Sequence, residues 1–104
     1  MQYSVEISEL AEEQYDNILD YLANEKKNSQ AVSGVINDFD YAVEQLERMA
    51  ETFGYCQDFR LKLMGFHKLH FKNYRYLFVY RINGSRVIIE GMYHELQDYE
   101  NAIG

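Results

Sequence analysis

The sequence contains only one cysteine, Cys56, which excludes an internal disulfide and any zinc site built on cysteine pairs. Proline and tryptophan are absent, and no low-complexity segment or linker interrupts the chain. No apolar run approaches the ~18 residues needed to span a bilayer, and the N-terminal residues lack the basic and apolar regions of a secretory signal. The 104 residues therefore predict a single cytoplasmic domain over 1–104, without membrane contact, in which Cys56 fills apolar space.

Positive charge is concentrated in the second half of the chain, although 17 acidic residues outweigh 10 Lys and Arg for a net charge of −7. Residues 1–57 carry −9, from three bases and twelve acids, whereas residues 58–104 carry +2, from seven bases and five acids. All seven of those bases lie within residues 59–89, which contain no acid. Because screening acts over ~10 Å, such a segment attracts phosphates even on an acidic protein. Ordinary lysines on a solvated sheet edge explain the same pattern equally well.

The first half of the chain reads as a strand followed by two helices. A strand is predicted over residues 2–7, where apolar and polar side chains alternate. Ser8 suits a helix N-cap, and the next apolar residues recur at helical spacing: Ala11, Tyr15, Ile18, Leu19 and Leu22. A second, longer helical stripe covers residues 32–53, with Gly34 inside it at some cost in helix stability and Gly54 placed to end it.

From residue 59 onward the apolar pattern changes from helical spacing to alternation, which predicts an antiparallel meander. The alternating segments are residues 59–63, 66–71, 74–82 and 86–94. Asn83-Gly84 is a strong hairpin signal, because both central residues of a type I′ turn need positive φ, and Lys72-Asn73 is a weaker one. We therefore predict an α+β fold: an N-terminal strand, a helical hairpin, then an antiparallel β-meander with the helices packed on one sheet face.

Two-residue turns at these positions sort the strand side chains onto two faces, and they pair Arg81 with Arg86 and His70 with Arg75. One face is apolar and is expected to meet the helices: Leu69, Tyr74, Tyr76, Phe78, Tyr80, Val87 and Ile89, with Gly91 leaving room for a helix and His67 packed. The other face is polar and mostly cationic: Lys68, His70, Arg75, Arg81, Arg86, Glu90 and His94.

The cationic face carries groups suited to RNA cleavage. Attack by a 2′-oxygen needs a base, an acid for the leaving 5′-oxygen and cations at the phosphate. His70 suits proton transfer, because histidine has a pKa near ~6.5, with Lys68 and Arg75 beside it and His94 nearby. The same groups also suit the carboxylates of a protein partner, and a strand histidine is more often structural than catalytic. Three histidines without a carboxylate cluster predict no metal site, and we predict no cofactor.

Several segments match one known family: the strand leading into S-x-x-A-x-x-x-Y, the helical hairpin, and residues 65–69, 74–82 and 93–99. Together they cover essentially the whole chain, which resembles the RelE/ParE superfamily of bacterial toxins from type II toxin–antitoxin modules. Arg75 resembles the arginine of the family's central strand, and Lys68 resembles the basic residue before that strand. His94 and Tyr99 match an ending that often reads H-x-x-R-D-Y, although Gln97 stands where the arginine would be.

The resemblance implies a small toxin that a cognate antitoxin neutralises by wrapping around it as a hetero-oligomer. RelE-like members cleave mRNA on the ribosome, and this activity is the first prediction for the chain. It implies catalytic roles for His70, Arg75, His94 and Tyr99, and RNA binding by Lys68, Arg81 and Arg86. ParE-like members instead inhibit DNA gyrase without being enzymes, and a third alternative is a non-toxic member that only binds its antitoxin. The cationic face favours the nuclease, whereas Gln97 and the acidic composition favour the other two.

Overall fold

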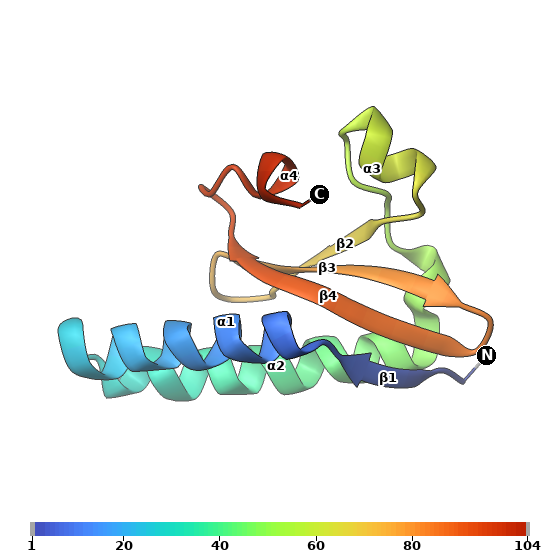
Figure 1. The fold of residues 1–104 in the computed structure, drawn as a ribbon. Helices are drawn as coiled ribbons and strands as arrows, with labels where there is room; N and C mark the ends of the chain where they lie inside the picture. The colour runs from blue at the N-terminus through green and yellow to red at the C-terminus, as the bar shows by residue number, and fades with distance from the viewer. Residues whose placement is uncertain (1, 104) are drawn as a thin grey trace.

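The structure is a computed structural model that describes residues 2–103, so the ends of the predicted domain, residues 1 and 104, lie outside the described residues. The elements in chain order are β1 (Ser4–Ile7), α1 (Glu9–Asp20), a π-helical turn η1 (Tyr21–Glu25), α2 (Ser29–Met49), a 3₁₀ turn η2 (Ala50–Thr52), α3 (Phe59–Leu63), β2 (His67–His70), β3 (Tyr76–Asn83), β4 (Arg86–His94) and α4 (Tyr99–Ala102). The two long helices lie side by side under one face of the sheet, and α3 and α4 stand on the other face (Figure 1). The predicted α+β fold is confirmed.

The sheet has the strand order β1-β4-β3-β2 and is mixed. β2, β3 and β4 form the predicted antiparallel meander, whereas β1 pairs with β4 in parallel. The two long helices carry the chain from β1 to β2, which lies at the opposite edge of the sheet and runs in the same direction as β1. Two antiparallel steps later, β4 again runs in the direction of β1 and pairs with it in parallel. Among the helices of residues 2–103, none combines the length and the apolar character that crossing a bilayer requires.

Polar caps set the beginnings of both long helices. The Ser8 hydroxyl accepts a hydrogen bond from Ala11 N at 3.0 Å and donates to Glu90 O at 3.1 Å, so the predicted N-cap also ties α1 to β4. Asn28 Oδ1 accepts from Ala31 N at 3.0 Å and starts α2 in the same way. The entry to each long helix is thus encoded locally.

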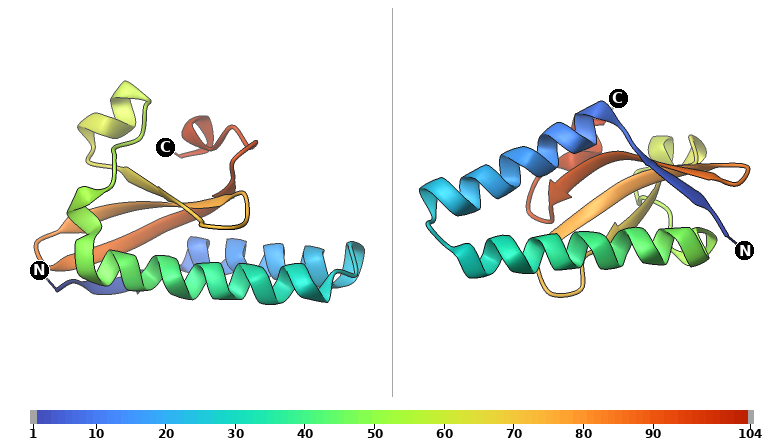
Figure 2. Two further views of the ribbon diagram at one scale, coloured as in Figure 1. Left: turned by 180° about the vertical axis from the view of Figure 1, so that it is seen from behind. Right: turned by 90° about the horizontal axis from the view of Figure 1, so that it is seen from below.

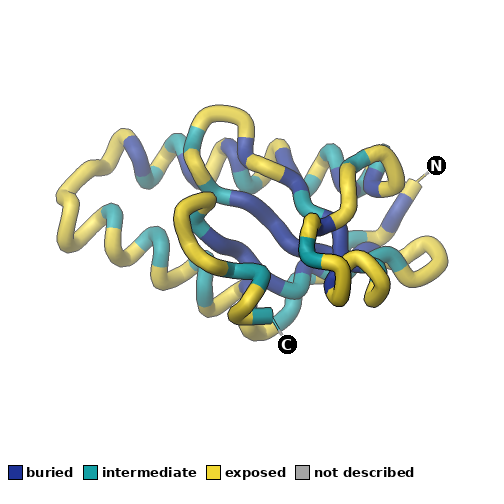
Figure 3. The backbone as a smooth tube through the Cα atoms, turned by 90° about the horizontal axis from the view of Figure 1, so that it is seen from above, coloured by how far each residue is buried: buried dark blue, intermediate teal, exposed yellow. Residues whose placement is uncertain are grey.

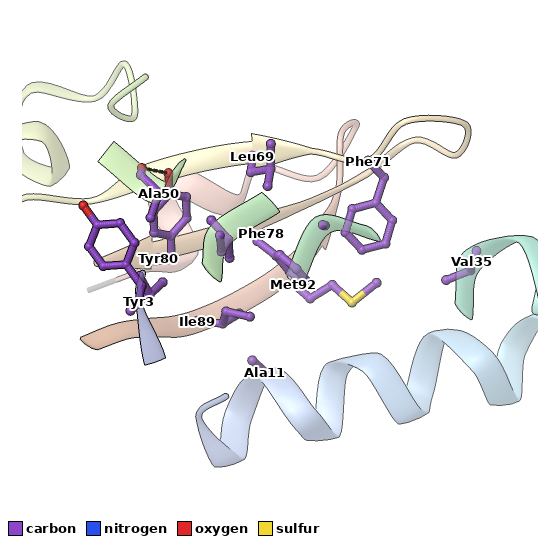
Figure 4. Close-up of a cluster of buried hydrophobic side chains, with 13 residues drawn as sticks. Tyr3, Ala11, Val35, Ala50, Leu69, Phe71, Phe78, Tyr80, Ile89 and Met92 are labelled. Carbon is purple, nitrogen blue, oxygen red and sulfur yellow. Dashed lines mark hydrogen bonds between the residues drawn. The ribbon is translucent and has the colours of Figure 1, made fainter. Parts of the chain in front are cut away.

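The main core lies between the two long helices and the sheet (Figure 4). Its fully buried members include Val35 and Leu46 from α2, and Phe78 and Tyr80 from β3. The Tyr80 hydroxyl donates a hydrogen bond of 2.7 Å to the Ala50 carbonyl, so the phenol is satisfied inside the core. The apolar face predicted for β3 is confirmed.

The strand predicted over residues 59–63 is wrong, because these residues form α3. Asp58 caps this helix by accepting a hydrogen bond from Leu61 N at 3.1 Å. Only Leu61 is buried, whereas Phe59 and Leu63 are 74% and 72% exposed. A one-turn helix with a single buried contact shows the same short apolar alternation as a strand, so the pattern alone does not separate them.

Both predicted turns are displaced, so the predicted strand pairings are wrong. Asn83 pairs with Arg86, which makes residues 84–85 the centre of the hairpin. Gly84 has φ +63° and Ser85 has no positive φ, which is the pattern of a type II′ turn with glycine first. Arg81 therefore does not pair with Arg86. Likewise His70 lies opposite Leu77 rather than Arg75. Phe71 N donates to Tyr76 O at 2.8 Å, which extends the pairing by one residue and leaves a loop of four residues, 72–75.

A β-bulge in β4 changes which residues share a face. Ile89 lies opposite Tyr80 and Gly91 lies opposite Val79, so Glu90 is the extra residue. Beyond the bulge every side chain of β4 faces the side opposite to the one predicted, because alternation continues from a shifted start. Gly91 consequently lies on the face away from the long helices. The prediction that it leaves room for one of these helices against the sheet is therefore wrong.

The second sheet face carries a small core of its own under α3 and α4. Its buried members are Cys56, Leu61, Phe66, Leu77, Val79 and Tyr93, with Tyr99 and Ile103 packed against them. Seen from this side, the buried centres of the strands lie between two exposed segments, one containing α3 and the other containing α4 (Figure 3). The face predicted to be cationic and open is therefore largely apolar and covered at its centre.

Candidate functional site

The arginines of the predicted RNA-binding set are engaged by carboxylates from other parts of the chain. Arg81 Nε donates to Glu90 Oε2 at 2.9 Å, and its terminal nitrogen contacts the same oxygen. Arg86 donates to both carboxylate oxygens of Glu6, with Nη2 to Oε1 at 3.0 Å, and these hydrogen bonds lower the pKa of Glu6. Phosphate binding at either arginine has to replace one of these ion pairs. The roles of Arg81, Arg86 and Lys68 in RNA binding stay a prediction.

His70 is exposed on β2, and its ring Nδ1 lies 3.0 Å from Glu95 Oε1. The Glu95 amide donates to the Arg75 carbonyl at 2.9 Å, so these three residues meet beside the loop that closes the β2–β3 hairpin. Sequence reasoning missed Glu95, because the predicted register placed β4 three residues out of step at this point. In the observed register Glu95 continues β4 beyond the Tyr76–His94 pair and therefore lies beside Arg75.

His94 does not join His70, although the sequence placed both on one face. It pairs with Tyr76, and the two rings meet edge to face with centroids 5.2 Å apart. Tyr76 packs against the main core, so His94 lies on the side of the long helices. Its Nδ1 accepts a hydrogen bond from Leu96 N at 3.1 Å, which occupies that ring nitrogen in the local turn. The bulge at Glu90 is the physical reason for the difference.

Tyr99 belongs to the small core rather than to an open site. Its ring stacks on Tyr93 with centroids 5.7 Å apart, and burial raises its pKa. The next residue, Glu100, accepts hydrogen bonds from Gln57 N and Asp58 N at 3.0 and 3.1 Å, just before α3. α4 is therefore joined to α3 by a carboxylate–amide contact as well as by apolar packing.

The third histidine, His67, is buried as predicted. Its ring stacks between Tyr55 and Tyr80, with centroids 4.1 and 5.2 Å away, and Nδ1 lies 2.9 Å from the Phe53 carbonyl oxygen. With these contacts the His67 ring has a structural role in the core. Within residues 2–103, no group of three or more His, Cys, Asp or Glu side chains is arranged to hold a metal ion.

Apolar side chains are exposed around α3 and border a groove at its junction with α4. Leu10, Phe59, Leu63 and Met64 are each more than half exposed, which is unusual for four large apolar side chains. The groove has a volume of about 270 Å³ and is lined by Leu10, Met64, Phe66, Glu90, Tyr93, Ala102 and Ile103. A surface of this kind is typical of a protein–protein contact.

Cys56 gives a direct test of how well the small core is closed. It is 1% exposed, and burial raises the pKa of its thiol to about 11. At pH 8 about one thiol in a thousand is then ionised, so we expect a thiol reagent to label the folded protein at least ~100-fold more slowly than the denatured protein. Any stability gained from the protonated thiol is lost as the pH rises from about 9 to about 11. Fast labelling of the folded chain would show that α3 and α4 open readily.

Comparison with known proteins points to one family. The profile of a family described as "ParE toxin of type II toxin-antitoxin system, parDE" matches residues 5–99. A solved structure described as "Chromosomal ParDE TA system from P. aeruginosa" is similar in fold, with a TM-score of 0.70 and 17% sequence identity. The likeness covers 89% of this chain and 96% of that chain. No curated protein sequence gives a significant match.

Proposed function

This chain belongs to the ParE toxin family of type II toxin–antitoxin systems, and we propose from this membership that it arrests growth by binding DNA gyrase, without being an enzyme. Inhibition by binding requires a complementary surface but no assembled acid, base and phosphate site. The RelE-like cleavage of mRNA that the cationic segment favoured has no support from the family match. A cognate antitoxin is proposed as the second partner, with the exposed apolar residues around α3 as its contact surface.

The observation that carries the proposal is the separation of the groups that RNA cleavage needs. His94 lies on the side of the long helices, Tyr99 is packed on Tyr93, and His70 is left with Glu95. A proton donor and a proton acceptor on opposite sides of one scissile phosphate both have to reach it within hydrogen-bond distance. This arrangement offers one exposed histidine and leaves the second catalytic partner on another face.

Replacing His70 with alanine distinguishes inhibition of gyrase from cleavage of mRNA. A gyrase inhibitor is expected to keep its growth arrest, because His70 is exposed and its contact with Glu95 is a surface pair. A nuclease that relies on His70 for proton transfer is expected to lose about 10²–10⁴-fold in cleavage rate. The measurement is induction of the chain alone in bacteria, with plasmid topology gels and primer extension on abundant transcripts.

His94→Ala is the matched control, because it removes a histidine from the other side of the sheet. Growth arrest with altered supercoiling and intact mRNA, in wild type and in both variants, is the expected result. New mRNA 5′ ends inside coding regions that disappear in His70→Ala would refute the gyrase proposal. A wild-type chain that causes no arrest would instead favour a member that only binds its antitoxin.

A further inference from the structure

The β2–β3 loop, residues 72–75, is held against α2 far more firmly than a hairpin connection requires, and it presents two unpaired cations. We infer that this anchored loop is a recognition surface for an acidic segment of a protein partner. The inference rests on the proposed function only in taking that partner to be the toxin's target. Figure 2 shows this loop, which closes the β2–β3 hairpin, lying beside α2.

Asp38 provides the first anchor. It is a buried carboxylate on α2, 3% exposed, and it accepts three hydrogen bonds from the loop. Asn73 N and Asn73 Nδ2 each donate at 2.9 Å, and Tyr74 N donates at 2.8 Å. Burying a carboxylate is costly unless its oxygens are satisfied, so Asp38 and the loop fix each other. The hairpin itself is closed by strand pairing and does not need this contact.

Gly34 provides the second anchor, one turn before Asp38 on the same face of α2. The Tyr74 ring lies so close to the helix that a Cβ at Gly34 would meet Tyr74 Cε2 at 2.2 Å. One turn beyond Asp38, the Lys72 ammonium lies 5.3 Å from the centre of the Tyr41 ring. At the other end of the loop, the Arg75 carbonyl accepts the hydrogen bond from Glu95. All four loop residues therefore have a contact outside the loop.

The two cations of the loop differ from the arginines on α3, β3 and β4 in having no ion-pair partner among residues 2–103. Arg60, Arg81 and Arg86 each have a carboxylate within ion-pair distance. Lys72 and Arg75 are exposed, and in the described part of the chain no carboxylate lies within 4.0 Å of either. Two cations held on a fixed backbone, neither with an ion-pair partner among the described residues, form a pre-organised site for carboxylates.

A protein partner fits this surface better than nucleic acid. Duplex binding by electrostatics typically uses about 6–10 phosphate contacts, far more than one loop supplies. The helical half of the chain behind the loop carries −9, which repels a polyanion that extends beyond the loop. A short acidic segment avoids this repulsion, because one or two carboxylates suffice to pair with Lys72 and Arg75.

The double variant Lys72→Glu/Arg75→Glu tests the inference, with Lys26→Glu/Lys27→Glu as the matched control. The control reverses two exposed cations at the turn between the long helices, so both variants change the net charge equally. The isotope-labelled full chain is titrated at low salt with a poly-glutamate peptide and, separately, with a short DNA duplex, and amide resonances are followed by NMR. We expect the peptide to shift resonances of residues 72–75 in wild type and control, with affinity at least ~10-fold weaker in the double variant.

A peptide that shifts no loop resonance, or equal binding by the double variant, would overturn the inference. Tighter binding of the duplex than of the peptide at the same residues would overturn the assignment to a protein partner. Inhibition of purified gyrase by the same variants is measured in parallel. Peptide binding at the loop without gyrase inhibition by wild type would contradict the proposed target and leave the acidic-partner surface standing, so the two failures are distinguishable.

Discussion

Replacing Asp38 with alanine is expected to lower the free energy of unfolding by about 3 kcal/mol and the melting temperature by roughly 10–20 °C. The carboxylate accepts three hydrogen bonds from Asn73 and Tyr74, and its removal leaves these donors beside a helix without an acceptor. The loss includes the packing of the β2–β3 loop on α2, so amide exchange of residues 72–75 is expected to accelerate as well. Thermal and denaturant unfolding, together with hydrogen exchange, measure both effects.

Asp40→Ala is the matched control for this substitution, because Asp40 is exposed on the same helix. It is expected to change the stability by less than ~0.5 kcal/mol. Asp38→Asn keeps the volume but presents one amide group to three donors, so an intermediate loss is expected. Equal stability of the Asp38→Ala and Asp40→Ala proteins would show that the loop is not anchored through this carboxylate.

Replacing Gly91 with alanine is expected to destabilise the fold by about 1–3 kcal/mol, which is the usual range for overpacking a core. Intrinsic preference predicts the opposite sign, since glycine inside a strand generally weakens it. A Cβ at Gly91 would lie 2.4 Å from Tyr93 Cε2, however, and Tyr93 is 5% exposed within the small core. The Tyr93 ring is stacked on Tyr99, so relief of the contact requires a shift of the ring against α4 or a shift of β4.

A double-mutant cycle with Tyr93→Leu isolates this contact. Shortening Tyr93 removes the atoms that clash, so Gly91→Ala is expected to cost much less in the Tyr93→Leu background than in wild type. Gly54→Ala is the control, because a Cβ at Gly54 meets nothing within 4 Å. A stabilising effect of Gly91→Ala in the wild-type background would refute the close packing of the Tyr93 ring against Gly91.

The elements that local signals encode were predictable. Ser8 marks the start of α1 through its own hydroxyl, and the apolar stripe of residues 32–53 predicts a long buried helix because its period matches one helix face. β4 begins and ends at the predicted residues, 86 and 94. The one strong local misreading, residues 59–63, is a segment with a single buried side chain, where strand and helix patterns coincide.

The register of the strands was not predictable, and it decides which of the predicted site residues share a face of the sheet. A hairpin signal at Asn83-Gly84 is compatible with a turn centred one residue later. The only sequence mark of the bulge at Glu90 is the neighbouring Gly91, which is equally compatible with a regular strand that packs closely. These two shifts move His94 to the side of the long helices and bring Glu95 beside Arg75. The predicted proton-transfer residues were therefore named from suitable chemistry but grouped on the wrong face.

By itself, the sequence determined the class of the fold, the family and the segregation of charge, because apolar period, capping residues and composition are local or additive properties. Only the tertiary structure decided which charges remain available. The segment 59–89 has no acid in sequence, yet Glu6, Asp58 and Glu90 reach three of its arginines from outside it. Ion pairs form between neighbours in space, so only the fold shows that Lys72 and Arg75, within the described part of the chain, stay without an ion pair on one anchored loop.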